Sequence, residues 1–329
     1  MPIGFEAEAF WVPAPGVGEI RRVPVAAPAA GEVLVRTLYS GLSRGTETLV
    51  FRGGVPESQR RAMRAPFQEG DFPGPVKYGY LNVGTVEQGP PELVGRTVFC
   101  LYPHQTRYVV PASAVTPVPD EVPAGRAILA GTVETAVNAL WDAAPLVGDR
   151  IAVVGAGMVG SCVARLLAGF PGVRVQLVDV DRSRAAVAEA LGVGFAAPAD
   201  AAGECDLVVH ASATEEGLAR SLELLADEGT VLEMSWYGDR RVAVPLGEAF
   251  HSRRLVVRGS QVGMVSPSRR SSRTFGDRLS LALRLLADPA FDALISGECD
   301  FGDLPEVLPR LTDGTLPGLC HRVVYGPAE

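Results

Sequence analysis

The sequence predicts an α/β protein in which a distorted β-barrel is joined to a doubly wound parallel sheet. Three observations predict this fold. Short apolar runs separated by Gly and Pro fill residues 1 to about 120, strands and helices alternate from Asp149 onward, and a polar segment after about Val265 leads to a helix and a short β tail. With 329 residues, 47% of them apolar and 21% charged, the chain is long enough for two domains and too apolar to be disordered.

The first region is expected to form irregular β structure. Its clearest apolar runs cover residues 32–36, 82–86, 96–101 and 107–110. Their separation by Gly and Pro is typical of a barrel rather than of a layered sheet. Residues 123–144 then predict one helix, which ends near Pro145 and Gly148.

The second region is expected to form a parallel sheet covered by helices on both faces, because apolar strands alternate with helical segments. The predicted strands are 151–154, 174–178, 206–209, 230–233 and 255–258, and the predicted helices are 159–167, 183–191 and 216–225. A polar loop rich in Ser and Arg follows, then a helix at 275–286 and a β tail that ends at Tyr325.

Charge and cysteine content narrow the class of protein. The formal net charge of −8, from 38 acidic and 30 basic residues, argues against a nucleic-acid or anionic-membrane partner, which would favour a basic patch. The five cysteines are far apart and form no C-x-x-C pair, so neither a disulfide framework nor a clustered zinc site is indicated. The N-terminus carries Glu6 and Glu8 and lacks a secretory pattern, and residues 151–164 are too few to span a membrane. We therefore expect a cytoplasmic protein.

A glycine motif predicts a dinucleotide site. Gly155-Ala-Gly-Met-Val-Gly160 follows an apolar strand and begins a helix. The acidic residue that accompanies this motif is Asp179, nineteen residues after Gly160. Gly155 permits the tight turn, Gly157 lets a pyrophosphate approach the backbone, and Gly160 lets helix and strand pack closely. The helix N-terminus offers N–H donors and partial positive charge to the phosphates. The alternative is a strand–turn–helix unit that needs its glycines for structure alone.

The expected cofactor is NAD. A carboxylate at Asp179 would accept hydrogen bonds from the adenosine ribose and repel a 2′-phosphate. Arg182 and Arg184 temper this preference, because either could pair with a phosphate, so NADP is the less favoured alternative.

The chain resembles the medium-chain dehydrogenase/reductase superfamily over nearly its whole length. The matching segments are Ser-Gly-Leu-Ser-Arg-Gly-Thr-Glu at 40–47, Thr-Ala-Val-Asn-Ala at 135–139 and Gly-Ser-Gln-Val-Gly at 259–263. The resemblance implies a GroES-like catalytic domain at residues 1–120, a Rossmann NAD-binding domain at 121–265, and a C-terminal segment at 266–329 that returns to the first domain. It also implies a homodimer that forms through the Rossmann edge strand near residues 255–265.

Members of this superfamily that use zinc hold the metal with a Cys, a His that is often followed by Glu, and a third Cys or Glu. The matching positions here are Ser43 (or Arg44), Tyr80, Leu81 and Gly131. These residues do not form an acceptable zinc donor set, and the four-cysteine lobe that binds a structural zinc is absent as well. No zinc is therefore expected.

The Ser-Arg-Gly-Thr-Glu segment and Tyr-Pro-His-Gln-Thr-Arg at 102–107 resemble the zinc-independent branch typified by 2-desacetyl-2-hydroxyethyl bacteriochlorophyllide dehydrogenase. That resemblance implies NAD-dependent interconversion of a secondary alcohol and a ketone, on a small-molecule substrate that it does not identify. Two alternatives remain. One is an NAD(P)H-dependent enoyl or quinone reductase, although that branch usually carries A-x-x-G-x-x-G and prefers NADPH. The other is a non-catalytic dinucleotide-binding protein.

A site without metal needs a side chain to move the proton of the substrate oxygen. The candidates are Lys77, which is the one lysine among 30 basic residues, Tyr80 beside it, and His104, whose ordinary pKa suits proton transfer near neutrality. Thr46 and Glu47 are candidates for positioning the substrate or the nicotinamide ribose, with surface polar residues as the alternative. The alternative is a surface lysine beside core tyrosines and a histidine in an exposed turn.

The superfamily pattern places the remaining cofactor contacts. Arg44 is expected at the pyrophosphate, and His210 is interpreted as a packing residue or a neighbour of the cofactor. The other predicted contacts are Met158, Val159, Val180, Ala211 and Ser212, with Thr135, Met234, Ser235, Trp236, Ser260, Gln261 and Val262 toward the nicotinamide.

Overall fold

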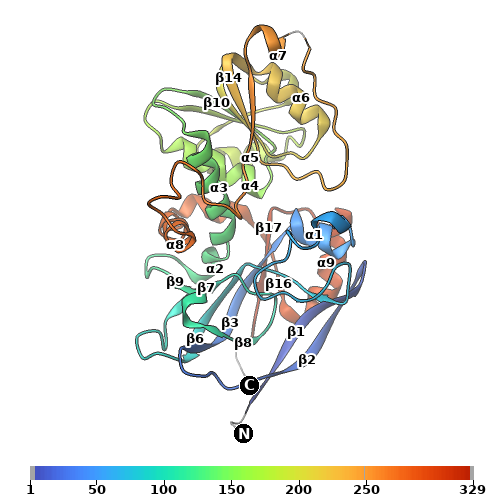
Figure 1. Ribbon diagram of the computed structural model, residues 1–329, viewed down its shortest axis with the longest axis vertical. Helices are drawn as coiled ribbons and strands as arrows, with labels where there is room; N and C mark the ends of the chain where they lie inside the picture. The colour runs from blue at the N-terminus through green and yellow to red at the C-terminus, as the bar shows by residue number, and fades with distance from the viewer. Residues whose placement is uncertain (1–3, 248, 327–329) are drawn as a thin grey trace. The chain divides into compact units, whose positions relative to one another are not determined.

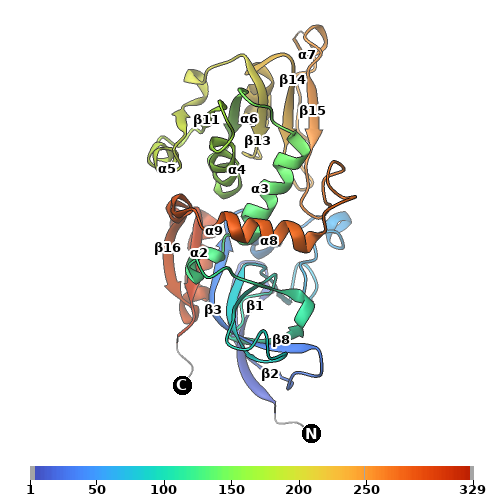
Figure 2. The same ribbon diagram turned by 90° about the vertical axis from the view of Figure 1, so that its left-hand side faces the viewer.

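The computed structural model describes residues 4–247 and 249–326, which form two compact units (Figures 1 and 2). The first, here called the barrel unit, runs up to Gly131 and also contains Leu283–Ala287 and the chain from Ile295 onward. The second, the Rossmann unit, comprises Thr132–Ala282 and Asp288–Leu294. The α/β fold class predicted from the sequence is confirmed.

Two sheets build the barrel unit. The larger has the strand order β16 (Ile295–Asp300), β17 (Cys320–Val324), β3 (Glu32–Ser43), β6 (Asn82–Gln88), β7 (Thr97–Cys100) and β9 (Val115–Pro117), with β8 (Arg107–Pro111) also paired to β3. The smaller has the order β2 (Val17–Val25), β1 (Phe5–Ala14), β5 (Val76–Lys77) and β4 (Glu69–Gly70). Apart from the parallel pair β16 and β17, the pairings are antiparallel.

Strand β3 organises the larger sheet, because it pairs with β6, β8 and β17. Its β-branched and leucine side chains suit a pleated, buried surface, and Val33, Leu34 and Val35 are fully buried. The pairing with β17 brings Ser43 opposite Cys320, although 277 residues separate them in the chain, so the blue and red strands lie side by side in Figure 1.

Two helices cover the barrel core. Helix α1 (Thr46–Phe51) begins three residues after Ser43, and α9 (Leu304–Asp313) precedes β17. Leu304, Leu308 and Leu311 recur at helical spacing on one face of α9 and are buried, which contributes about 1.5–3 kcal/mol each to folding. The helix ends at Gly314, whose φ of 84° is readily adopted by glycine.

The Rossmann unit contains a six-stranded parallel sheet, drawn green to orange in Figure 1. Its order is β12 (Gly194–Ala196), β11 (Arg174–Val178), β10 (Arg150–Val154), β13 (Cys205–His210), β14 (Leu225–Glu233) and β15 (Val256–Gly259). The chain starts the sheet at β10, adds β11 and β12 on one side, and then adds β13, β14 and β15 on the other side. This strand order is that of a doubly wound dinucleotide-binding sheet. The other α-helices in the described residues are α2 (Ala124–Ala127), α3 (Ala130–Ala143), α4 (Met158–Ala168), α5 (Arg184–Ala190), α6 (Glu215–Glu223), α7 (Ala249–Ser252) and α8 (Phe275–Leu285).

Local details differ from the sequence-based expectation. The single helix predicted over residues 123–144 is broken into α2 and α3. Ile128 and Leu129 at the break are completely buried, and Arg126 donates to the main-chain carbonyls of Leu286 and Ala287, so tertiary contacts determine the break. Strands β1, β2 and β16 were not predicted; in β2, arginines and a proline obscure the alternation that marks a strand.

The division into units also differs from the expected boundaries. The barrel unit continues past residue 120 to Gly131, because α2 packs against β3 and β6. The Rossmann unit continues past Val265 to Ala282, because buried Arg278 of α8 is hydrogen-bonded to Glu134 of α3. Within the C-terminal segment, β16 and β17 extend the barrel sheet. No helix in the described residues is both long and apolar enough to cross a membrane.

Candidate active site

A buried carboxylate lies at the junction of β3 and α1. Glu47 stands in the first turn of α1, where a carboxylate complements the helix dipole. Its Oε1 accepts a hydrogen bond of 2.8 Å from the main-chain N–H of Ser43, which fixes the carboxylate against the end of β3. Its side chain is only 5% exposed, so it needs a partner.

That partner is His104, which lies between β7 and β8 and is 1% exposed. Its Nε2 is 2.7 Å from Glu47 Oε2, and its Nδ1 is 2.7 Å from Ser40 Oγ. The hydroxyl of Tyr325 lies a further 3.0 Å from Ser40 Oγ. In the neutral tautomer that suits a carboxylate acceptor, Nε2 of His104 carries the proton and donates to Glu47, and Nδ1 accepts from Ser40. Tyr325 then donates to Ser40, and burial raises the pKa of Tyr325, which keeps it protonated.

The position of the imidazole explains a glycine. Gly79 has a φ of 137°, and a Cβ there would lie 3.0 Å from Cδ2 of His104. The main chain of His104 is held as well, because its carbonyl accepts a 2.9 Å hydrogen bond from the N–H of Phe10 in β1. His104 is therefore a fixed, buried residue and not the exposed turn histidine that the alternative interpretation supposed.

Tyr80 reaches the same cluster from the next residue of the chain. Its hydroxyl is hydrogen-bonded to the side chains of Ser43 and Thr46. Burial raises the pKa of Tyr80, and the charge of Glu47 raises it further, against the opposing effect of those hydrogen bonds. The phenol is thus held protonated, as a hydrogen-bond donor, beside the Glu47–His104 pair.

Lys77 is buried in a different environment. Its Nζ donates to Glu69 and, at 2.6 Å, to Gln105 Oε1, and it lies 5.3 Å from the centre of the Tyr102 ring. Burial lowers the pKa of Lys77, and Glu69 opposes this effect. None of these contacts involves the hydroxyl of Tyr80. The ammonium links β4 and β5 to the segment that follows His104.

The positions matched to zinc ligands are occupied by residues that do not bind zinc. Leu81 is fully buried, and a Cβ at Gly131 would lie 2.7 Å from its Cδ2. Cys320 lies opposite Ser43 on the neighbouring strand, and burial raises the pKa of its thiol to about 12, with a further contribution from Glu47. No group of three His, Cys, Asp or Glu side chains suited to a metal occurs in the described part of the chain. Ser, Tyr, Leu and Gly do not fit a catalytic zinc.

The glycine turn has the geometry that the motif requires. Gly155 has a φ of 109°, and a Cβ there would lie 2.7 Å from the carbonyl carbon of Ala211. A Cβ on Gly160 would lie 1.9 Å from the carbonyl oxygen of Gly155, so only glycine fits. Gly157 caps α4 and is exposed, which leaves the N-terminus of that helix open to an anion.

Asp179 lies directly beside this turn. Its Oδ2 accepts a 2.7 Å hydrogen bond from the N–H of Ala156, and its Oδ1 accepts one of 2.8 Å from Asp181. Both nearby arginines have acidic partners, since Arg184 lies 3.2 Å from Asp181, and Arg182 lies 3.6 Å from Asp200.

A buried pair that the sequence did not reveal holds two of the predicted cofactor loops. His210 Nδ1 lies 2.8 Å from Glu233 Oε2, and its Nε2 lies 2.7 Å from Ser212 Oγ. Glu233 Oε1 accepts from the N–H of Ser235, whose Oγ accepts from Ala213. Burial alone would raise the pKa of Glu233, but the hydrogen bond and charge of His210 outweigh it, so that pKa is lowered. The loops after β13 and β14 are therefore tied together.

The predicted site residues divide between the units. The glycine turn, Asp179, Val180, Ala211, Ser212, Thr135 and the segments 234–236 and 260–262 belong to the Rossmann unit. Val180 is 83% exposed. Lys77, Tyr80, His104 and Arg44 belong to the barrel unit, where Arg44 is exposed near Gly314.

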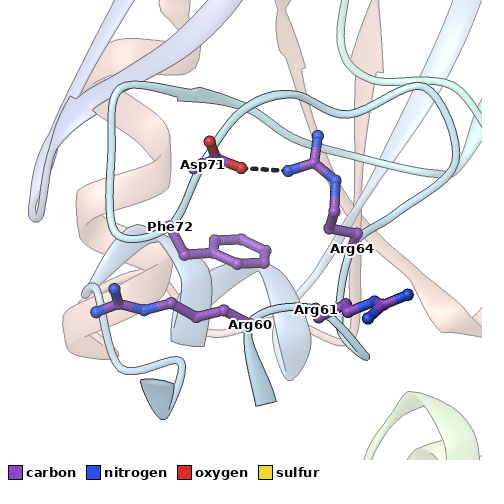
Figure 3. A pocket seen from close by; sticks show the side chains of 5 residues that line it. All are labelled: Arg60, Arg61, Arg64, Asp71 and Phe72. Carbon is purple, nitrogen blue, oxygen red and sulfur yellow. Dashed lines mark hydrogen bonds and ion pairs between the residues drawn. The ribbon is translucent and has the colours of Figure 1, made fainter. Parts of the chain in front are cut away.

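A separate pocket of about 350 Å³ lies in the barrel unit, lined by Arg60, Arg61, Arg64, Asp71 and Phe72. Arg64 is bonded to Asp71. Figure 3 shows that the guanidinium groups of Arg60 and Arg61 point in opposite directions, so the positive charges do not converge on one point. The centre of the Phe72 ring lies 5.6 Å from that of the Tyr78 ring.

The fold is shared with known dehydrogenases. L-idonate 5-dehydrogenase from Escherichia coli matches with a TM-score of 0.81 and 16% identity over 98% of this chain and 99% of that chain. A protein from Sinorhizobium meliloti described as a zinc-binding dehydrogenase, bound to NADP, matches at 0.78 and 16% over 97% and 99%. An E. coli alcohol dehydrogenase complexed with NADH matches at 0.76 and 15% over 97% and 99%. A scan against protein-family models found no match, and neither did a search of curated proteins. At these identities the likeness confirms the predicted combination of Rossmann and GroES-like folds.

Proposed function

We propose that the protein is an NAD-dependent oxidoreductase that interconverts a secondary alcohol and a ketone by hydride transfer without catalytic zinc. The observation that carries the proposal is the hydroxyl of Tyr80, bonded to Ser43 and Thr46 and influenced by the charge of Glu47, which is paired with His104. A protonated hydroxyl beside a buried acid–base pair can hydrogen-bond a substrate oxygen and assist the transfer of its proton. In zinc enzymes the metal polarises that oxygen and lowers the pKa of its proton. The dehydrogenases of the same fold support this reaction class by analogy.

The proposed cofactor is NAD rather than NADP. The carboxylate of Asp179 beside the glycine turn favours ribose hydroxyls and disfavours a 2′-phosphate. Arg182 and Arg184, the two side chains best placed in sequence to bind that phosphate, already have acidic partners. One structural neighbour is described as bound to NADP, so the preference for NAD over NADP is to be measured on this protein.

NAD, when bound, takes up or supplies the hydride. The residues of this chain handle the oxygen and its proton. Tyr80 donates a hydrogen bond to a ketone oxygen and accepts one from an alcohol. When an alcohol is oxidised, its proton must leave. In this proposal the hydroxyl of Ser40 takes up that proton and passes its own to Nδ1 of His104, 2.7 Å away, the ring atom that carries no proton in the neutral tautomer. Glu47, 2.7 Å from Nε2, stabilises the imidazolium that results.

The experiment is an assay of the purified protein with NAD and a panel of secondary alcohols, followed by the absorbance of NADH. We expect turnover that neither a chelator nor added zinc changes. Consumption of NADPH by an activated alkene, with no alcohol oxidised, would instead identify an enoyl or quinone reductase. Binding of NADH without turnover of any substrate class would identify a non-catalytic dinucleotide-binding protein. Loss of activity in chelator and its recovery with zinc would overturn the metal-free mechanism.

A further inference from the structure

Helix α3 carries a polar stripe that the proposed reaction does not use. Glu134, Asn138 and Asp142 recur every four residues, which places them on one face of the helix. Glu134 is 6% exposed and Asn138 is 1% exposed, although polar side chains of this kind are usually at the surface. A buried polar stripe on an otherwise apolar helix has to be explained by its partners.

The main partner is Arg278 of α8, which is 1% exposed. Its Nε donates to Glu134 Oε1 at 3.0 Å, and one terminal nitrogen donates to Asn138 Oδ1 at 2.5 Å. The same guanidinium donates to the main-chain carbonyls of Val262, at 2.6 Å, and Met264, at 3.3 Å. The ring of Phe275 covers it at 5.2 Å. Arg278 therefore connects α3 to the segment that follows β15.

The rest of the stripe binds the same segment, residues 260–266, here called the 260–266 loop. Asn138 Oδ1 accepts from the N–H of Ser266 at 3.0 Å, and its Nδ2 donates to the carbonyl of Gln261 at 3.4 Å. Asp142 Oδ2 accepts from the Ser260 hydroxyl at 2.6 Å. Asn138 and Asp142 of α3 and Arg278 of α8 thus fix both ends and the middle of this loop, and Glu134 acts on it through Arg278.

Such a buried ion pair is energetically unfavourable as a purely structural contact. A buried ion pair loses the hydration of both charges, and apolar residues of similar volume often stabilise a fold as well or better. What the guanidinium adds is direction, because its planar set of N–H donors fixes several acceptors at once. Arg278 donates here to main-chain carbonyls of the loop that contains Ser260, Gln261 and Val262. Its other partner, Glu134, immediately precedes Thr135 in the chain.

We propose that Arg278, with Glu134 and Asn138, positions the 260–266 loop relative to Thr135 and thereby shapes the site for the nicotinamide end of the cofactor. This inference rests on the proposed function, and on the expectation from the superfamily resemblance that Thr135 and residues 260–262 lie toward the nicotinamide. Arg278 is a positioning residue in this account, because it acts through the loop and touches no reacting atom.

The test compares two ligands that share the adenosine, ribose and pyrophosphate groups. NADH has a nicotinamide and ADP-ribose does not, so only NADH depends on the 260–266 loop. Isothermal titration calorimetry is done on the wild type, Arg278→Met and the milder Glu134→Gln, which keeps a hydrogen-bond acceptor. We expect the affinity of Arg278→Met for NADH to fall about tenfold or more, with a smaller fall for Glu134→Gln, while ADP-ribose binding stays within about twofold.

Arg165→Met is the matched control. Arg165 forms an arginine–aspartate pair with Asp288 in the same unit and also donates to Leu191, without contact to the loop. We expect it to bind both ligands as the wild type does. NADH affinity unchanged in both Arg278→Met and Glu134→Gln would overturn the inference, and so would an equal loss of both ligands in Glu134→Gln, which would indicate a general structural role. A wild type that binds ADP-ribose but not NADH, or neither ligand, would refute the proposed function itself.

Discussion

Nε2 of His104 lies 2.7 Å from Oε2 of Glu47, with both side chains buried in the barrel unit. A carboxylate that orients an imidazole and stabilises its charged form is a recurrent acid–base arrangement. Here the Ser40 hydroxyl is hydrogen-bonded to the other ring nitrogen, Nδ1, and Tyr325 donates to Ser40. Hydrogen bonds therefore hold the imidazole at both nitrogens. The predictions below separate the roles of this pair from those of Tyr80 and Lys77.

Removing either member of the pair should impair proton transfer. We expect His104→Gln and Glu47→Gln each to lower kcat by about 10²-fold or more, since a positioned acid–base group contributes that much. If the two act as a unit, the double variant should be no slower than the slower single variant. Steady-state kinetics test this, with NADH affinity as the control for folding. Wild-type kcat in both single variants would exclude the pair from catalysis.

Tyr80 should act as a protonated hydroxyl throughout the neutral range. Because burial and the charge of Glu47 raise its pKa above the ordinary value of 10, the phenol loses its proton only in strong alkali. We therefore expect Tyr80→Phe to lower kcat by about 10²-fold by a constant factor between pH 6 and pH 9. The measurement is the pH profile of kcat for the variant and the wild type.

Tyr78→Phe is the control for that substitution, because the ring of Tyr78 lies 6.0 Å from that of Tyr80 and is similarly buried. Its kcat should stay near that of the wild type. A Tyr80 effect confined to one limb of the profile would show that the tyrosine titrates in this range, contrary to the expectation.

The environment of Lys77 predicts an effect on stability. Glu69→Gln leaves a buried ammonium without its carboxylate and should lower the free energy of unfolding by about 1–3 kcal/mol at pH 7. Lys77→Met should be less destabilising, because it removes the buried charge altogether. The pKa of Lys77 is already below 10.5, so the unfolded chain binds more protons between the folded pKa and 10.5, and stability rises with pH in that window.

Denaturation in urea at pH 7 and pH 9.5 measures both effects, and the deficit of Glu69→Gln should shrink at the higher pH. The kcat of Lys77→Met, corrected for the folded fraction, distinguishes the catalytic interpretation of Lys77 from this structural one. A 10²-fold loss of kcat in a stable variant would support the catalytic interpretation of Lys77.

The sequence carries the local features of this fold and few of its long-range contacts. The apolar segment 151–154, the glycine turn and Asp179 are close in sequence, so their geometry follows from strand, turn and helix preferences, and the structure agrees with it. The Glu47–His104 contact joins residues 57 apart, and Ser40 and Tyr325 are 285 apart. Such pairings depend on how β3, β8 and β17 come together, which no spacing in one sequence reveals.

Tertiary packing also determines the partners of the candidate side chains. Lys77 and Tyr80 are neighbours in sequence, but the side chain of Lys77 is bonded to Glu69 and Gln105, while Tyr80 is bonded to Ser43 and Thr46. Neighbouring positions in the chain do not give these two side chains the same partners, because tertiary packing determines the partners of each.

Asp179 should determine the choice between NAD and NADP. Asp179→Asn keeps a hydrogen-bond acceptor for the N–H of Ala156 and removes the charge that repels a 2′-phosphate. We expect the ratio of kcat/KM for NAD to that for NADP to fall about tenfold or more. Glu189→Gln, on an exposed position of the following helix, controls for the general change in charge. An unchanged ratio in Asp179→Asn would remove the basis for the NAD preference.

The edge of the Rossmann sheet predicts a homodimer. Strand β15 is the last strand of the sheet, paired with β14, and Val256 and Val257 on it are 41% and 40% exposed. Apolar side chains on an exposed edge strand favour pairing with another strand, and a second copy of the chain offers an identical edge. We expect a dimer by sedimentation equilibrium and a shift toward monomer in Val257→Lys, because a charge on the edge opposes strand pairing. Val180→Lys, at a position 83% exposed in a loop, should leave the mass unchanged. A monomeric wild type at micromolar concentration would contradict the prediction.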